Sequence, residues 1–340
     1  MPSVVYAWQF SRWKQPIVRR FFEGVRVVFV RRAAQVPSDS TLALWGCMAV
    51  PEYLPRGVQI IRLEDGFLRS VGLGADLIRP LSWVIDTHGL YYDATRPSDL
   101  ELILQETEFT PALIRRASRF RERVVSSGLT KYNVGSGSWH RPAGEKRVIL
   151  VPGQVESDAS LAFGAPGIRT NLGLLRAVRE ANPDAWLVYK PHPDVLAGLR
   201  AKGVGEDDAA SWCDEYVTDV AMGEMLEKVD ELHVLTSLAG FEALLRGKAV
   251  TCYGQPFYAG WGLTVDVLPV TRRMRNLMLD ELVAGVLLLY PAYVSWVQGR
   301  RVMAEQALDE LVVRRASLGD KLPWWRKLFR VVLRRVVGVR

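Results

Sequence analysis

The sequence predicts an α/β protein with two Rossmann-type domains. Runs of β-forming residues alternate with stretches of helical apolar spacing, which is typical of parallel sheets covered by helices. The chain has 340 residues, whereas a single core usually stops growing at about 250–300 residues. A stretch rich in Gly, Ser and Pro, 136–144, separates the two halves. We therefore expect an N-terminal domain over 1–140, a C-terminal domain over 145–300 and C-terminal helices with a basic tail over 301–340.

The first half carries strand-like segments at 4–6, 25–30, 41–46 and 58–63, with a basic helical stretch at 10–22. We expect 25–30 to be a buried strand of the parallel type because it is mostly apolar. Two short paired strands are expected at 82–85 and 90–92, around the turn 86–89. Ser98 is placed to cap the next helix, and the amphipathic, arginine-rich stretch 110–128 predicts another helix.

The second half repeats the alternation. Strands are expected at 147–151, 186–189 and 231–235, and helices at 170–182, 222–229, 280–290 and 303–317. The segment 253–263 is aromatic and glycine-rich. It would either offer a stacking surface for a sugar or base or cover the cleft with hydrophobic side chains, and the sequence leaves both interpretations open.

The composition is that of an ordinary globular protein, with 49% hydrophobic and 24% charged residues. Its three cysteines, Cys47, Cys213 and Cys252, are odd in number and far apart, so they indicate neither a disulfide framework nor a metal site. The N-terminus lacks a charged segment followed by a long apolar one, so no secretory signal is expected. We expect a cytoplasmic protein that needs no metal or other cofactor.

The net charge of +7 is concentrated at the C-terminus. Residues 321–340 hold seven basic residues and no acidic one, and the rest of the chain is balanced. Aromatic and aliphatic residues interleave with these cations, which is typical of an interfacial helix on anionic lipid. The alternative is a terminal helix that packs on the body with its arginines solvated. Nucleic acid is not an expected partner, because the basic residues form no groove-sized patch on the body.

Three polar signatures follow runs of β-formers in the second half. They are PGQVESD (152–158), KPHPD (190–194) and TSLAGFE (236–242). In a parallel α/β sheet the carboxyl ends of neighbouring strands open onto one crevice, where ligands bind. We therefore expect the three signatures to line a shared site.

The residue types in these signatures fit a nucleotide sugar. Lys190 and His192 stand on a turn stiffened by prolines and suit a phosphate. Ser237 begins a helical stretch, so its hydroxyl and the first N–H groups form a second anion contact. Glu242, further along that helix, is placed to reach a ribose hydroxyl or a base edge. As alternatives, His192 would be a plain turn residue and Ser237 an ordinary N-cap.

Carboxylates beside a departing phosphate suggest glycosyl transfer. Glu156 and Asp158 supply them in the first signature, and Gln154 is a further substrate contact there. For Asp158 the alternative is a loop acid that caps a helix. Arg69 and Arg96 are candidates for a substrate carboxylate, because the guanidinium group matches it in bidentate fashion; surface ion pairing is the alternative. Asp65 lies beside Arg69 after a strand and joins the candidate substrate contacts.

Six motifs together resemble the KpsC-type capsule polysaccharide β-Kdo transferases. They are EDGFLRSVGLG (64–74), YDATRPSDL (92–100), VPGQVESD (151–158), YKPHPDV (189–195), TSLAGFEALLRGK (236–248) and CYGQPFYAGWGL (252–263). The resemblance implies a GT-B-like fold, in which two Rossmann-type domains face a central cleft and the C-terminal one holds CMP. It also implies retaining transfer of the acidic sugar Kdo from CMP-β-Kdo, without a metal.

By this resemblance Asp158 is the nucleophile, and Glu156 is the nearby acid/base or orienting group. Lys190, His192 and Ser237 correspond to CMP phosphate contacts. The acceptor would be a poly-Kdo linker on lysophosphatidylglycerol at the cytoplasmic face of the inner membrane, ahead of a capsule exporter. Members of the family resemble a tandem of two modules, whereas this chain has room for one. The resemblance therefore implies either that the chain adds one kind of Kdo linkage only or that it works beside a partner Kdo transferase.

Two other functions are compatible with these residues. A non-catalytic component of polysaccharide binding or export would need the cleft but no reactive carboxylate. An inverting CMP-sugar transferase of the sialyltransferase type would give the opposite anomeric configuration.

Overall fold

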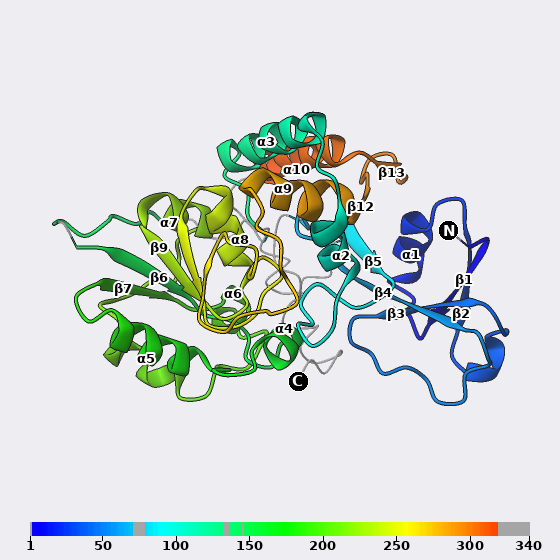
Figure 1. Cartoon of the computed structure of the whole chain (residues 1–340), viewed down its shortest axis with the longest axis horizontal. Coiled ribbons are helices and arrows are strands. Elements are labelled where there is room, and N and C mark those ends of the chain that lie inside the picture. Colours follow the sequence, from blue (N-terminus) through cyan, green and yellow to red (C-terminus); the bar gives the residue numbers. More distant parts are fainter. Residues whose placement is uncertain (1, 71–78, 132–136, 145, 319–340) are drawn as a thin grey trace.

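The computed structural model describes residues 2–70, 79–131, 137–144 and 146–318. It contains two β-sheets with helices packed against them, which confirms the predicted α/β class with two Rossmann-type units. Figure 1 shows the sheets side by side, the first in blue and cyan with its late strands β12 and β13 in orange, and the second in green and yellow.

The first sheet has seven strands in the order β13-β12-β5-β4-β3-β1-β2. Its parallel part consists of β1 (Val4–Trp8), β2 (Arg26–Val30), β3 (Thr41–Trp45) and β4 (Gln59–Asp65), and β5 (Ser82–Asp86) pairs antiparallel with β4. Helix α1 (Gln15–Phe21) buries Ile17, Val18 and Phe21. The Phe21 ring stacks on Trp83 of β5 with the ring centres 4.5 Å apart, which fixes α1 against the sheet.

Two predictions for this sheet are wrong. The segment 25–30 is not a buried strand: β2 forms the edge of the sheet, and only Val30 of its five residues is buried. Residues 90–92 form no strand, because the Asp86 carboxylate accepts the N–H groups of His88 and Gly89 and closes a turn there. The true neighbour of β5 on that side is β12 (Pro291–Val294), which comes from far along the chain.

The second sheet has six parallel strands in the order β11-β10-β9-β6-β7-β8. They are β6 (Val148–Pro152), β7 (Trp186–Lys190), β8 (Glu215–Tyr216), β9 (Glu231–Val234), β10 (Ala249–Cys252) and β11 (Val265–Asp266). The helices of this half are α4 (Ala159–Gly164), α5 (Asn171–Ala181), α6 (Pro193–Leu196), α7 (Met222–Lys228) and α8 (Leu238–Leu245). Because β9, β6 and β7 are adjacent and parallel, the three polar signatures that follow them leave the sheet at one edge.

After the second sheet the chain returns to the first. Helix α9 (Leu279–Val283) continues into a π-helical segment, Ala284–Leu289, and β12 then pairs with β5. β13 (Arg301–Val302) and α10 (Ala304–Leu318) follow. Residues 291–294 thus belong to the first sheet although they fall inside the range expected for the second domain. In Figure 1, α3 (Pro111–Ser126), α9 and α10 lie together above the junction, and α3 packs against α9.

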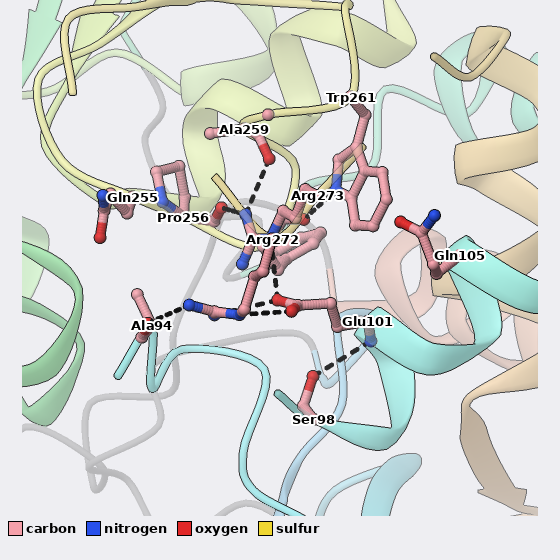
Figure 2. A network of polar contacts seen from close by, with 12 residues as sticks. Ala94, Ser98, Glu101, Gln105, Gln255, Pro256, Ala259, Trp261, Arg272 and Arg273 are labelled. Carbon is pink, nitrogen blue, oxygen red and sulfur yellow. Dashed lines mark hydrogen bonds and ion pairs between the residues drawn. The ribbon is translucent and has the colours of Figure 1, made fainter. Parts of the chain in front are cut away.

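A buried ion cluster ties a loop of the second sheet to helix α2 (Asp99–Glu106) of the first half, as Figure 2 shows. The carboxylate of Glu101 accepts from Nε of Arg272 at 2.5 Å and from Nε of Arg273 at 2.9 Å. Arg273 also donates to the carbonyl oxygens of Pro256 and Ala259. The cluster therefore fixes the loop after β10 against the first half.

Candidate active site

A cavity of about 800 Å³ lies between the two sheets and is lined by residues from both. Its position at the carboxyl ends of parallel strands is the usual ligand site of α/β folds. The cavity brings together all the predicted site residues except Glu156 and Arg96, namely Asp65, Arg69, Gln154, Asp158, Lys190, His192, Ser237 and Glu242.

Asp158 lies in the loop between β6 and α4 and caps the helix. Its Oδ1 accepts the N–H of Ser160 at 2.9 Å, so the predicted capping role is real. Oδ2 has no hydrogen-bond partner among the described residues, and the side chain lines the cavity. One carboxylate oxygen is therefore held by the backbone, and the other is left to contact a ligand.

Glu156, two residues earlier, does not line the cavity. Its two oxygens accept the backbone N–H groups of Asn171, at the start of α5, and of Val204, at 2.7 and 2.8 Å. The expectation that Glu156 works as an acid/base beside Asp158 is therefore corrected: its carboxylate braces two loops.

Lys190 ends β7 and is 7% exposed. Its Nζ makes one long hydrogen bond, 3.4 Å, to the carbonyl oxygen of Thr218, and it forms no ion pair within the described part of the chain. Burial lowers the pKa of Lys190, although the nearby Asp219 carboxylate opposes the shift. A buried ammonium group without a carboxylate at 4 Å or less is suited to a ligand anion.

His192 follows Lys190 and caps α6: its Nδ1 accepts the N–H of Asp194 at 3.1 Å. This bond places the ring proton on Nε2. Burial, reinforced by the positive charge of Lys131, lowers the pKa of His192 to about 4. The ring is therefore neutral near pH 7, with its proton on Nε2.

The lowered pKa of His192 predicts a pH dependence of stability. Between pH 6.5 and about 4 the unfolded chain takes up a proton at His192 that the folded chain does not, so folding becomes less favourable as the pH falls through this window. His192→Asn retains a capping side chain. Its unfolding free energy, measured in urea at about pH 7 and about pH 5, is expected to fall less than that of the wild type.

His88 provides a control of opposite sign. Its hydrogen bond to Asp99 raises the pKa of His88, so protonation of His88 stabilises the folded state at low pH. His88→Asn should therefore lose more stability than the wild type on acidification. Equal losses in the wild type and in His192→Asn would contradict the burial of a neutral His192.

Ser237, Glu242 and Gln154 line the cavity from the β9–α8 and β6–α4 segments. Ser237 Oγ accepts the N–H of Ala239 at 3.2 Å as the N-cap of α8. Glu242 accepts the backbone N–H of Lys131 at 2.6 Å, and burial raises the pKa of Glu242 to about 7.

Gln154 pairs with Thr236 through two hydrogen bonds. Its Oε1 accepts the Thr236 N–H at 2.9 Å, and its Nε2 donates to Oγ1 at 3.0 Å. Gln154 thus holds the ends of β6 and β9 together at the rim of the cavity.

The two candidate arginines lie in different places. Arg69 is buried on the cavity wall, where its Nε donates to Asp65 at 2.5 Å. Asp65 also accepts Nε1–H of Trp83 at 3.1 Å. Arg96 does not line the cavity: its side chain is 59% exposed and pairs with Asp93 at 3.3 Å. The expectation of a substrate contact at Arg96 is corrected to a surface ion pair.

Sequence reasoning missed several residues of the first half of the chain that line the cavity. They include Trp13, Lys14, Trp45, Glu64 and Tyr92. Tyr92 donates to Glu64 at 3.0 Å, and burial raises the pKa of Glu64. Trp45 and Glu64 lie at or near the carboxyl ends of β3 and β4, and Lys14 lies in the loop after β1. In the second half we looked for polar side chains at the carboxyl ends of parallel strands. The same criterion, applied to the first half, would have identified these residues.

The aromatic loop 253–263 acts mainly as hydrophobic cover. Tyr258 and Trp261 are fully buried, and Trp261 Nε1 donates to the carbonyl oxygen of Phe257. Within this loop only Pro256 and Phe257 reach the cavity lining.

Within residues 2–70, 79–131, 137–144 and 146–318, no three or more His, Cys, Asp or Glu side chains are grouped to hold a metal ion. No helix in this part of the chain combines the length and apolar character needed to span a membrane. The basic segment 321–340, for which membrane contact is expected, lies outside the described residues.

Comparison with known proteins assigns the family. The family model described as capsule polysaccharide biosynthesis protein matches residues 54–134 and 138–302. The chain belongs to this capsule polysaccharide biosynthesis family. A curated family relative, the capsule polysaccharide modification protein LipA of Neisseria meningitidis serogroup A, is 44% identical over 318 residues. That match covers 91% of this chain and 45% of LipA, so the chain spans about half the length of this relative.

Two solved structures match over nearly the whole chain. The KpsC β-Kdo 2,7 transferase of Thermosulfurimonas dismutans is 44% identical, with a TM-score of 0.76 and coverage of 92% of this chain and 99% of that one. The KpsC β-Kdo 2,4 transferase of the same organism is 32% identical, with a TM-score of 0.77 and coverage of 90% and 97%. The predicted resemblance to KpsC-type proteins and the GT-B-like fold are confirmed.

Proposed function

We propose that this protein is a retaining β-Kdo glycosyltransferase that uses CMP-β-Kdo as its donor. The observation that carries the proposal is the convergence of Asp158, Lys190, His192 and Ser237 on one cavity between the two sheets. The similarity to two KpsC β-Kdo transferase structures supports the same reaction class.

In the proposed reaction the second sheet binds CMP. The Lys190 ammonium, the Nε2–H of His192 and the N-terminus of α8 at Ser237 would contact the phosphate, whose negative charge they offset. The positive charges of Lys131, Arg200 and Lys190 act on His192, opposed by the carboxylate of Asp158. The three positive charges would stabilise CMP as the leaving group.

Asp158 would carry the covalent step. Its Oδ2 forms a bond to the anomeric carbon while the bond from that carbon to the phosphate oxygen breaks, and CMP departs with the bonding electrons. An acceptor hydroxyl then attacks the same carbon from the vacated face. Its proton leaves to water, and the bond to Asp158 breaks and restores the carboxylate. Two inversions give net retention.

We further propose a lipid-linked acceptor of the lysophosphatidylglycerol type, bound at the cytoplasmic face of the inner membrane. The basic and apolar residues of segment 321–340 support contact with anionic lipid. In this proposal the chain extends a poly-Kdo linker beside a partner Kdo transferase and ahead of a capsule exporter. No metal or other cofactor takes part.

The test is to incubate the protein with CMP-Kdo and a Kdo-terminated lipid acceptor. We expect release of CMP and a lipid product whose new linkage is β by NMR. No CMP release would favour a non-catalytic role in polysaccharide binding or export. An α-linked product would instead identify an inverting transferase and remove the nucleophilic role of Asp158.

A further inference from the structure

The first-sheet wall of the cavity carries a lysine without a counter-ion. Lys14 lies at the start of α1 and lines the cavity with Trp13 and Trp45. Within the described part of the chain its ammonium group forms neither a hydrogen bond nor an ion pair; its one specific contact is with the Trp45 ring, 3.3 Å from Nζ to the ring centre. Partial burial of an ammonium group costs desolvation free energy unless an anion or a polar group binds it.

No other charge on this wall forms a direct ion pair with Lys14 among the described residues. Arg69 and Asp65 form an ion pair with each other at 2.5 Å. The pKa of Glu64 is raised by burial, which weakens its negative charge near neutral pH. The Asp65 and Glu64 carboxylates therefore act on Lys14 only from beyond ion-pair distance, and its ammonium group has no direct carboxylate partner among the described residues.

Aromatic surface surrounds this charge. Trp45 meets Trp83 edge-on at 5.0 Å between ring centres, and Trp83 stacks on Phe21 in the core. The stack fixes the Trp45 ring and thereby the Lys14 ammonium above it. Trp13 lines the same cavity and is 38% exposed. Rigid indole rings beside a cation form a surface suited to an acidic sugar. The sugar ring can pack on the indole rings while its carboxylate contacts the ammonium group.

The position of Lys14 separates it from the donor contacts. The charges that act on Lys14 are those of Asp65, Glu64 and Arg69, all in the first half of the chain. The charges that act on His192 are those of Lys131, Asp158, Arg200 and Lys190. Lys14 and the Lys190–His192 turn thus line the cavity from different halves of the chain.

We propose that Lys14, held over Trp45, binds the carboxylate of the acceptor's terminal acidic sugar and makes the enzyme selective for an acidic acceptor. This inference rests on the proposed transferase function and names the residue that recognises the charge of its acceptor. The sequence suggested Arg69 and Arg96 as the residues that bind a substrate carboxylate. We assign a carboxylate contact to Lys14 instead, because Arg69 pairs with Asp65 and Arg96 lies outside the cavity.

The experiment compares a Kdo-terminated glycoside acceptor with its methyl ester, which lacks the charge. For Lys14→Gln we expect kcat/KM on the acid to fall about 10- to 100-fold, mainly through KM, and kcat/KM on the ester to change little. Lys14→Arg should retain part of the preference for the acid. Lys146→Gln is the matched control, because Lys146 also lies over a tryptophan, Trp186, but outside the cavity.

Equal losses on acid and ester in Lys14→Gln would overturn the proposal, since a structural role would affect both acceptors alike. If the wild type transfers nothing from CMP-Kdo, the proposed function fails, and the carboxylate site is then tested by direct titration with the glycoside and its ester. Tighter binding of the acid, lost in Lys14→Gln, would support the site. Equal affinities in the wild type would exclude it.

Discussion

Replacing Asp158 with asparagine is expected to reduce sugar transfer by at least about 1,000-fold, because an amide is too weak a nucleophile to form the covalent intermediate. The change is nearly isosteric. Asparagine keeps an oxygen that can accept the Ser160 N–H, so the start of α4 should persist. The affinity for CMP, measured by titration, should therefore stay close to that of the wild type.

Intact-mass spectrometry after mixing with CMP-Kdo provides the second measurement. The wild type should show the mass of a Kdo adduct on the chain, and Asp158→Asn should show none. Asp208→Asn is the matched control, since Asp208 is exposed and lies outside the cavity. Transfer by Asp158→Asn at the wild-type rate would rule out Asp158 as the nucleophile.

Replacing Glu101 with glutamine is expected to lower the free energy of unfolding by about 3–5 kcal/mol, the usual result of removing one partner of a buried ion pair. Glu101 is 7% exposed and faces both Arg272 and Arg273. Without its charge the buried Arg273 guanidinium loses its ion pair, and the Asp266 carboxylate acts on it only from beyond ion-pair distance. The loss can be measured by urea denaturation, with the mid-point and slope fitted together.

The exposed pair between Arg123 and Asp309 gives the control for Glu101. Both side chains are largely solvated, so Asp309→Asn should change the unfolding free energy by less than about 1 kcal/mol. If Glu101→Gln costs no more than Asp309→Asn, the cluster in Figure 2 does not hold the two halves of the chain together.

The second sheet and its side of the site could be predicted because the information is local. Each signature directly follows a run of β-formers, and adjacent parallel strands carry Asp158, Lys190, His192 and Ser237 to one cavity. The direction of each side chain was not predictable. Glu156 is two residues from Asp158, yet its carboxylate points to backbone amides of α5 and residue 204, which only the folded chain brings near.

Long-range pairing limited the prediction for the first half. β5 finds its antiparallel neighbour, β12, about two hundred residues later in the chain, and no local pattern indicates that register. Local patterns favour the segment 90–92 as the partner strand of β5 instead, because it is near in sequence and rich in β-formers. Arg96 could not be distinguished from Arg69 by residue type, since their difference is burial.

Strand β12 belongs to the first sheet although it comes after the second sheet in the chain, and this limits how the protein can be cut into fragments that fold. A fragment that stops before Pro291 would leave one side of β5 without the hydrogen bonds that β12 supplies, and that unsatisfied strand edge would favour aggregation. The two halves are therefore poor candidates for separate expression. Circular permutation would have to keep 291–302 covalently attached to the N-terminal strands.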